Sequence, residues 1–256
     1  MPTALITGAS SGLGEHFAYA LARLNYNLVL VARRKDRLDG VAAKTRELGA
    51  AGAEVIVADL ARRETPQEIC DQLVATKTSI DCLINNAGFG TNGPFHQLGL
   101  EREVEEIDLN ITALVALTRL LLPQMIERHA GTIINVASTA AFQPLPYMAT
   151  YAATKAFVLN FTSALAGELV GSGLRVLALC PGPVETEFQS VAKNEHGRMP
   201  KFVYVSAENV VAEGITAAAS GRTVYIPGWL NFITAQSTRL MPRNVISFFA
   251  RRIYKP

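Results

Sequence analysis

The sequence predicts a single α/β domain in which helices cover both faces of a parallel sheet. Short apolar runs of strand length alternate with longer helical patterns from the first residues to about residue 226. This rhythm is typical of βαβ units with right-handed crossovers, which build a doubly wound sheet. The chain has 256 residues and is 49% hydrophobic, which suits one large core better than two small ones. We therefore expect residues 1–256 to form one domain.

The bulk composition excludes several functional classes. The net charge is only +2, and no basic run is interleaved with aromatic residues, so no nucleic-acid partner is predicted. Three scattered cysteines in apolar segments indicate reduced core residues of a cytoplasmic protein. The four histidines lack the spacing of metal ligands. No signal peptide is expected before the first strand, and Arg119 interrupts the best membrane-span candidate at residues 114–122.

A glycine-rich turn joins the first predicted strand, residues 3–6, to a helix ending near residue 25. Glycines let the backbone approach an anion, and a helix start offers unpaired N–H groups and the positive end of the dipole. The turn therefore predicts a phosphate cradle, although glycine spacing also arises for steric reasons alone. The candidate cofactor-binding residues of the turn are Gly8, Ser10, Ser11, Gly12, Leu13 and Gly14.

The second predicted strand, residues 27–31, is followed by Ala32, Arg33, Arg34 and Lys35. Dinucleotide-binding turns usually place an acid here to hold the adenosine ribose hydroxyls, whereas Ala32 and Arg33 suit a 2′-phosphate. The other interpretation is a set of solvated charges at a helix start. The helix dipole disfavours cations at that place, so a phosphate contact by Arg33 and Arg34 is preferred.

Further candidate cofactor-binding residues follow the third and fourth predicted strands. A helix to about residue 48 precedes strand 54–58, which ends in Asp59 and Leu60. Asp59 either accepts a hydrogen bond from an adenine amine or forms a turn, and both interpretations stay open. Helix 66–77 precedes strand 82–84, which runs into two asparagines and a small pair where a flat cofactor can lie close: Asn85, Asn86, Ala87 and Gly88.

The middle of the chain predicts a long helical region over residues 100–129, which Pro123 is expected to kink or interrupt. Asn110 stands in its apolar surface, either as a helix-bending surface residue or as an inward amide that holds a water. A fifth strand, residues 132–137, ends in Ser138. The loop over residues 139–150 then carries several apolar side chains.

The next helix, residues 151–169, begins with Tyr151 and carries Lys155 one turn later. Positions four apart lie on one helix face, so the phenol and the ammonium should stand one above the other. A tyrosine has a pKa of about 10. A cation about 4 Å away favours phenolate by roughly 4 kcal/mol at an effective dielectric near 20, or about three pKa units. The pair therefore predicts a tyrosine able to transfer a proton near neutral pH.

The last part of the chain adds strand 174–179, a helix over residues 207–219 and a final strand 224–226. Pro181, Gly182, Val184 and Thr186 follow strand 174–179, and residues 187–205 predict a substrate flap. The extension over residues 229–256 is amphipathic and basic and contains no acidic residue. Such a segment either lies on an anionic membrane surface or packs on its own domain, over a substrate mouth or on a partner subunit; packing is preferred.

Together these features resemble the short-chain dehydrogenase/reductase family, in its NADP(H)-preferring branch. The resemblance covers roughly residues 3–228, and its specificity lies in the joint order and spacing of the motifs. It implies a Rossmann fold with strand order 3-2-1-4-5-6-7, a nicotinamide cofactor and a homodimer or homotetramer built from helices 100–129 and 151–169. The motifs that carry it are Thr7-Gly8-Ala9-Ser10-Ser11-Gly12-Leu13-Gly14, Asn85-Asn86-Ala87-Gly88, Asn110, Ser138, Tyr151, Lys155 and Pro181-Gly182.

The same resemblance implies a role for each catalytic candidate. Tyr151 is the proton donor in reduction, and Ser138 hydrogen-bonds the substrate oxygen. Lys155 binds the nicotinamide ribose hydroxyls and depresses the pKa of Tyr151, while Asn110 holds a water that links Lys155 to solvent. For the cofactor, Asp59 and Leu60 meet adenine, residues 86–88 meet the adenosine half, and Val184 and Thr186 meet the carboxamide.

The expected activity is NADP(H)-dependent hydride transfer between the nicotinamide and a carbonyl or secondary alcohol. The apolar loop 139–148, with Phe89 and Phe95, predicts a pocket for a hydrophobic or bulky ketone or aldehyde; these residues otherwise complete the core. Two alternatives remain: a non-catalytic NADP(H)-binding regulatory protein, and a 3-oxoacyl or hydroxysteroid-type dehydrogenase working in the oxidative direction. No metal is expected, and NAD(H) is the less favoured cofactor.

Overall fold

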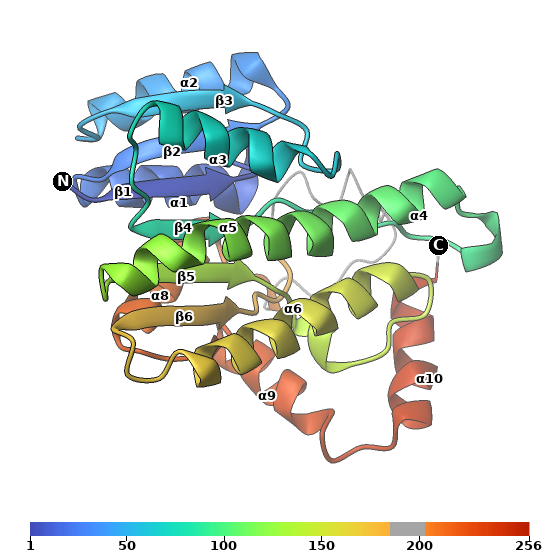
Figure 1. Ribbon diagram of the computed structural model, residues 1–256. Helices are drawn as coiled ribbons and strands as arrows, with labels where there is room; N and C mark the ends of the chain where they lie inside the picture. The colour runs from blue at the N-terminus through green and yellow to red at the C-terminus, as the bar shows by residue number, and fades with distance from the viewer. Residues whose placement is uncertain (185–202, 256) are drawn as a thin grey trace.

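A seven-stranded parallel sheet forms the centre of the computed structural model, which describes residues 1–184 and 203–255 (Figure 1). The strand order is β3-β2-β1-β4-β5-β6-β7, and every pair is parallel, as the sequence predicted. The strands are β1 (Thr3–Thr7), β2 (Asn27–Ala32), β3 (Ala53–Val57), β4 (Cys82–Asn85), β5 (Gly131–Val136), β6 (Leu174–Leu179) and β7 (Val224–Tyr225).

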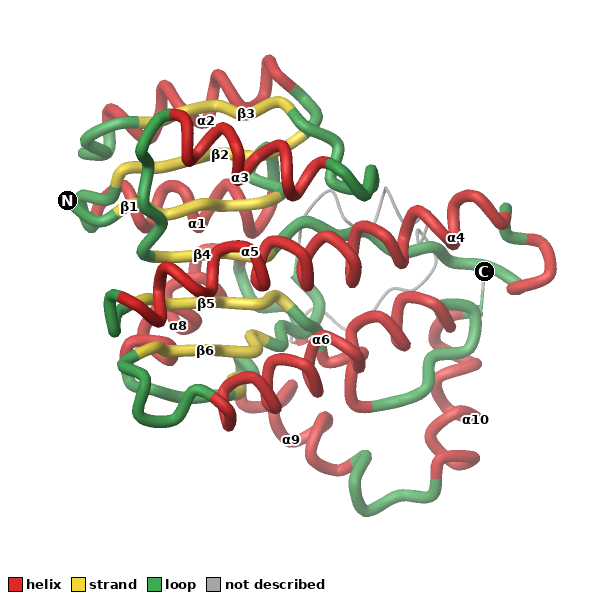
Figure 2. Tube along the Cα trace, in the orientation of Figure 1, coloured by secondary structure: helices red, strands yellow, loops and turns green. Residues whose placement is uncertain are grey.

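Helices lie on both faces of the sheet (Figure 2). The α-helices of the described residues are α1 (Gly12–Arg23), α2 (Lys35–Glu47), α3 (Thr65–Ala75), α4 (Leu100–Ile107), α5 (Ala113–Glu127), α6 (Ala149–Glu168), α8 (Ala207–Ala219), α9 (Trp229–Ser237) and α10 (Arg243–Tyr254). Shorter helical turns are η1 (Phe95–Gln97), η2 (Asp108–Thr112) and η3 (Thr139–Phe142). Each element that the sequence predicted within the described residues is present, with ends shifted by a few residues.

The sheet separates two apolar cores because successive strand side chains point to opposite faces. In β1, Ala4 and Ile6 pack with α1, α2 and α8, whereas Leu5 packs with α3, α5 and α6. The carboxyl ends of β1, β3, β4, β5 and β6 meet at one edge of the sheet. Figure 1 shows α10 beyond those ends, beside α6.

The sequence predicted a kink or break of the helical region 100–129 at Pro123. The region is instead interrupted around Asn110. Residues Asp108–Thr112 form a turn of π-helix, in which the N–H of Ala113 bonds the carbonyl of Asp108 five residues back. Pro123 lies inside α5, which continues to Glu127. Pro123 has no backbone N–H, so the carbonyl of Arg119 loses its hydrogen-bond partner. Both residues are exposed, so water can bond that carbonyl.

Residues 100–127 pass a length-and-composition test for a membrane span, which the sequence reading had not anticipated. The test is weak evidence because core helices of soluble proteins pass it as well. Here the segment packs on α3 and β5, and its buried side chains include Leu117 and Met125. The three cysteines are free and buried, as expected.

Candidate active site

A cavity of about 770 Å³ lies along the carboxyl edge of the sheet. It extends from the glycine-rich turn after β1, past the ends of β3, β4 and β5, to α6 and α10. The sheet places these segments together because parallel strands of a doubly wound sheet present their carboxyl ends on one side. Most of the predicted site residues therefore line one cavity. Gly14 and Asn110 lie behind its wall, and Thr186 and residues 187–202 of the predicted flap lie outside the described residues.

The turn after β1 has the shape of an anion cradle. Gly8 and Gly12 adopt φ values of +65° and +57°, which disfavour side chains, and α1 begins at Gly12. A Cβ at Gly14 would lie 2.2 Å from the carbonyl oxygen of Gly8, so the turn and the helix can approach this closely only without a side chain there. The first turn of α1 thus presents unpaired N–H groups to the cavity, and the residues fit a dinucleotide diphosphate.

Asn86 braces this turn from the end of β4. Its side-chain Nδ2 donates to the carbonyl oxygen of Thr7 over 2.9 Å. In return the Thr7 hydroxyl oxygen accepts from the backbone N–H groups of Asn86 and Ala87, over 2.9 and 3.0 Å. The Asn86 amide therefore fixes the neighbouring backbone, whereas the Asn85 amide bonds the side chains of Thr118 and Asn135. Ala87 and Gly88 line the cavity with little or no side chain.

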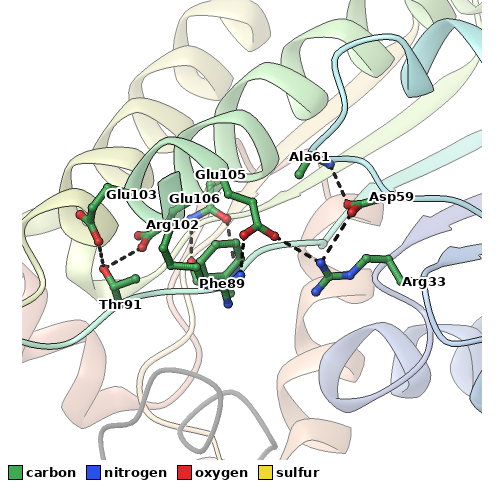
Figure 3. Close-up of polar contacts among 10 residues, drawn as sticks. Arg33, Asp59, Ala61, Phe89, Thr91, Arg102, Glu103, Glu105 and Glu106 are labelled. Carbon is green, nitrogen blue, oxygen red and sulfur yellow. Dashed lines mark hydrogen bonds and ion pairs between the residues drawn. The ribbon is translucent and has the colours of Figure 1, made fainter. Parts of the chain in front are cut away.

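Two arginines lie at the far end of the cavity from α10. Arg34 Nη2 donates to the Ser11 hydroxyl over 2.7 Å and to the Ser10 hydroxyl over 3.3 Å, so it crosses the glycine-rich turn. Arg33 Nη1 lies 3.7 Å from Asp59 Oδ2 and 3.2 Å from Glu105 Oε1 (Figure 3). Both guanidinium groups reach the rim where the cradle ends, and half of the Arg33 side chain stays exposed.

Asp59 takes the turn-forming role that was left open. Its Oδ1 accepts from the N–H of Ala61 over 3.1 Å, and its Oδ2 faces Arg33 (Figure 3). Leu60 is buried beside it and lines the cavity. The Asp59 side chain is also partly exposed, and its contact with adenine stays a prediction.

Tyr151, Ser138 and Lys155 lie together at the buried end of the cavity. The Ser138 hydroxyl oxygen accepts from the N–H of Ala140 over 3.1 Å, which fixes its rotamer, and Ser138 is hydrogen-bonded to Tyr151. Lys155 Nζ donates to the carbonyl oxygen of Val136 over 2.8 Å and lies 5.8 Å from the centre of the Tyr151 ring. The one-turn stacking of phenol and ammonium predicted from the sequence is therefore present.

The lowering of the Tyr151 pKa that was expected from Lys155 is not found. Burial raises the pKa of Tyr151 well above its ordinary value, and the hydrogen bond with Ser138 offsets only part of this. Burial likewise lowers the pKa of Lys155 to about 8, against the charge of Glu106, which raises it. Desolvation penalises both charged forms, and a sequence pattern shows the cation but not the burial. Near neutral pH Tyr151 therefore keeps its proton as a donor.

The side-chain amide of Asn110 is hydrogen-bonded to two other segments of the chain. Nδ2 donates to the Phe89 carbonyl over 2.9 Å and to the Thr154 hydroxyl over 3.0 Å, and Oδ1 accepts from the Phe89 N–H over 3.1 Å. The side chain thus fixes the strand-end loop beside Gly88, and the water bound by Asn110 stays a prediction. A Cβ at Gly88 would lie 2.7 Å from Asn110 Oδ1 and 3.5 Å from Lys155 Nζ.

Much of the wall opposite Tyr151 comes from the C-terminal extension, which contributes apolar side chains from α10 and polar ones, Asn231, Thr234, Ser237 and Thr238, from α9 and the residue after it. Ala250 of α10 packs with Tyr151, Met148, Leu145 and Ala140, and the Asn92 amide holds the carbonyl of Tyr254 over 3.2 Å. The extension therefore packs on its own domain along the cavity, which is one of the packing arrangements that the sequence left open. The other apolar lining side chains from this extension are Met241, Ile246, Phe249 and Ile253.

Some predicted lining residues are absent from the cavity and some lining residues were missed. Phe89 lines it beneath Arg102, whose guanidinium lies 3.6 Å from the ring centre, but Phe95 is 65% exposed and lies outside. Asn231 of α9 was missed: it is buried, and a Cβ at Gly182 would lie 2.4 Å from its amide. In the sequence, the only sign that Asn231 lines the cavity was its place in an otherwise apolar helix start.

Comparison with known proteins agrees with this geometry. The model of the short chain dehydrogenase family matches residues 2–197. A ketoacyl reductase, HetN, of Nostoc sp. is 35% identical over 241 residues, which cover 93% of this chain and 82% of that protein. The chain is also similar to a short-chain dehydrogenase from Sphingobium yanoikuyae in complex with NADPH, with a TM-score of 0.84, 34% identity and 94% of each chain covered.

A second solved structure is similar over nearly the whole chain. It is the bulky-bulky ketone specific alcohol dehydrogenase from Comamonas testosteroni, with a TM-score of 0.79 and 32% identity over 94% of this chain and 92% of that one. The seven-stranded order and the cavity at its carboxyl edge are thus those of a Rossmann-type oxidoreductase. The chain belongs to the short-chain dehydrogenase family.

Proposed function

We propose that the protein is an NADP(H)-dependent reductase of ketones or aldehydes with bulky, apolar substituents. One observation carries the proposal: a hydrogen-bonded Ser138–Tyr151 pair, with Lys155 beside it, closes the buried end of the cavity that begins at the glycine-rich cradle. The residues of this cavity would hold a dinucleotide, which would supply hydride chemistry at the end where the two hydroxyl groups lie. A protein that only binds a dinucleotide has no use for such a pair.

Each side chain then has a defined task. The bound cofactor supplies a hydride to the carbonyl carbon. The Ser138 hydroxyl donates a hydrogen bond to the carbonyl oxygen and stabilises its developing charge. Tyr151, protonated because burial raises its pKa, donates its proton to that oxygen. Lys155 orients the ribose through its ammonium, and Asn110 supports the loop beneath it through Phe89.

The preference for NADP(H) rests on the two arginines at the cradle. Arg34 already donates to two hydroxyls of the turn, and Arg33 reaches over the same rim. Neither Ala32 nor Arg33 offers a carboxylate to ribose hydroxyls, whereas guanidinium groups bind phosphate in bidentate fashion. The similar Sphingobium structure, which contains NADPH, supports this choice.

The proposed substrate class rests on the residues that line the Tyr151 end of the cavity. Among the described residues that line the cavity around Tyr151, Lys155 is the only charged side chain, and the part of the wall that α10 contributes is mainly apolar. An ionised substrate would lose its hydration there without a partner. A ketone with bulky apolar groups fits this wall, and the relationships to a ketoacyl reductase and a bulky-ketone alcohol dehydrogenase support it.

The proposal is tested by following NADPH absorbance over a panel of aryl ketones, steroids, 3-oxoacyl thioesters and sugars. The wild type should oxidise NADPH with at least one bulky apolar ketone, and Tyr151→Phe should lower kcat by about 10²- to 10⁴-fold while NADPH still binds. Turnover by Tyr151→Phe at the wild-type rate would remove the catalytic assignment. NADPH binding without turnover of any carbonyl would favour a regulatory binder.

We also propose a homodimer or homotetramer built through α4–α5 and α6. On α6, Phe157 is partly exposed and stacks on Phe161 at 5.8 Å between ring centres, an apolar surface suited to a second copy. Light scattering coupled to gel filtration measures the mass directly. A monomer at micromolar concentration would contradict this proposal.

A further inference from the structure

The C-terminal extension, residues 229–256, leaves apolar side chains exposed that have no task in the site above. Nineteen large apolar side chains are exposed among the described residues, and eight of them lie in this 28-residue segment. Three are on α9, two in the loop that follows and three on α10, and Leu240 and Trp229 are 90% and 71% exposed. Single exposed apolar residues are ordinary on a soluble protein, whereas such a concentration marks an interaction surface.

The helix α10 shows why these side chains stay exposed although the extension packs on its own domain. Ile246 and Ala250 are one turn apart and buried, and Ala250 packs with Tyr151. Phe248 lies two positions from each of them, so it points to the opposite side of the helix, where it is 53% exposed. There the Arg252 guanidinium lies 4.4 Å from the centre of the Phe248 ring. The exposed side chains of residues 229–256 thus form an outer face of the extension that the fold itself does not use.

This outer face is also strongly basic. All five cations of the segment are exposed, and none has an ion-pair partner within residues 1–184 and 203–255. The segment contains no acidic residue, and the net charge of the whole chain is only +2, so the rest of the chain is net negative. Figure 1 shows α9, α10 and the loop between them extending away from β1, β2 and β3. A partner that covers this end must supply negative charge to face Arg239, Arg243, Arg251, Arg252 and Lys255.

Charge and shape together favour a lipid surface over other partners. A second copy of the chain that used the same face would bring these cations together without an acid to pair with them, which opposes association. A nucleic acid offers flat bases for stacking on aromatic rings, but the aliphatic side chains of Ile233, Leu240 and Met241 have no partner there. A fluid lipid surface accepts protruding aromatic and aliphatic side chains without a matched pocket, while its phosphates face the cations.

The outer face continues into the lining of the cavity. Met241, Phe249 and Ile253 line the cavity and are also 40%, 53% and 42% exposed, so they form part of its rim. A surface that covers the outer face therefore lies next to the opening of the cavity on the α10 side. This arrangement suits an apolar substrate, because a molecule dissolved in lipid reaches the cavity without first crossing water.

We propose that the outer face of the extension docks on an anionic lipid surface. In the docked state the side chains of Trp229, Leu240 and Phe248 lie between the headgroups and the first acyl carbons, and the guanidinium groups pair with lipid phosphates. The docking goes beyond the proposed function and does not depend on it. Delivery of an apolar ketone from the lipid to the cavity deepens that function and rests on it.

Trp229 provides a direct test, because it is the only tryptophan of the chain and lies on the outer face. The whole protein is mixed at low salt with vesicles of phosphatidylcholine alone or with an equal amount of phosphatidylglycerol. With the anionic vesicles the fluorescence should shift to shorter wavelength and the protein should co-sediment, and about 0.5 M salt should reverse most of both effects. Unchanged fluorescence without co-sedimentation on the anionic vesicles would overturn the proposal, and so would equal binding to both kinds of vesicle.

The double variant Arg251→Gln with Arg252→Gln separates docking by this face from a general effect of charge. The two lost cations should raise the apparent Kd for the anionic vesicles about 10- to 30-fold. Lys44→Gln with Arg46→Gln is the matched control, because it removes two exposed cations from α2 and changes the net charge equally. Its Kd should stay within about twofold of the wild type. Equal losses in both double variants would overturn the assignment to the outer face, as would a Trp229 already shielded from acrylamide by a second copy in the protein alone.

Activity on vesicles tests the part that rests on the proposed function. Anionic vesicles that contain a long-chain aryl ketone should lower the KM for that ketone in the wild type and in the control, but not in Arg251→Gln with Arg252→Gln. Equal KM values in the three proteins would overturn the delivery of substrate from lipid. Docking without reduction of any carbonyl compound would contradict the proposed function and leave the docking established, whereas reductase activity without docking would overturn the docking and leave the proposed function in place.

Discussion

The two ends of the central cavity are built in opposite ways. The cradle end comes from consecutive strand ends and turns within the first 90 residues, and it carries the two arginines, Asp59 and the hydroxyls of the glycine-rich turn. The Tyr151 end joins α6 to α10, whose contacting residues lie about 100 positions apart, and the wall that α10 contributes is mainly apolar. The first end is fixed by backbone geometry, whereas the second depends on which side chains α10 carries. Cofactor and substrate recognition should therefore respond separately to mutation.

The largest effect that would separate the two ends is expected at Ser138. Ser138→Ala removes the donor to the carbonyl oxygen and should lower kcat by about 10²- to 10³-fold. The Kd for NADPH, measured by fluorescence, should stay within about twofold, because the cradle is untouched. Ser163→Ala, a hydroxyl on the exposed face of α6, serves as the control. An equal loss in NADPH affinity would mean that the two ends are not independent.

An intermediate effect is expected at the cradle end. Arg34→Ala removes a guanidinium that would hold a 2′-phosphate and should reduce the ratio of NADPH to NADH affinity about 10- to 100-fold. The kcat at saturating cofactor should change little. Lys35→Ala is the matched control, because Lys35 is an exposed cation in the same turn that pairs with Asp39 over 2.6 Å. An unchanged ratio in Arg34→Ala, and in the corresponding Arg33→Ala, would remove the phosphate role from this end.

The smallest effect is expected at the apolar wall. Ile253→Ala shortens a lining side chain of α10 and should lower kcat/KM for a bulky ketone about tenfold, with little effect on a small ketone. Phe95→Ser is the contrasting change: Phe95 is mostly exposed and outside the cavity, so kcat/KM should stay within about twofold and stability within about 0.5 kcal/mol. Equal losses for large and small ketones in Ile253→Ala would show that α10 does not select the substrate.

The sequence predicted the cradle end well because its determinants are local. Apolar runs that alternate with helical patterns gave every strand of the described sheet, and glycines at strand ends indicated the turn with positive φ at Gly8. The Tyr151–Lys155 stacking followed from the helical repeat alone. These features depend on residues that are close in sequence, which is the range over which patterns are informative.

The sequence predicted the Tyr151 end less well because its determinants are tertiary. The direction of the Tyr151 pKa shift depends on burial under α10, and no pattern within residues 151–169 shows that burial. The side chain of Asn110 found its partners in Phe89 and Thr154, two segments that the chain brings together only on folding. The sequence did not single out the buried Glu106, because its partner Thr91 lies in a separate loop.

The central claim is that the two ends of one cavity bring a reduced nicotinamide and the Ser138–Tyr151 pair to the same carbonyl group. It is tested most directly with NADPH deuterated at the transferring carbon and a bulky aryl ketone, with the product analysed by mass spectrometry and NMR. The account predicts one deuterium on the carbinol carbon of the product made by the wild type, and no such product above background from Tyr151→Phe with NADPH bound. An alcohol product without deuterium on that carbon, or equal product from both proteins, would contradict it.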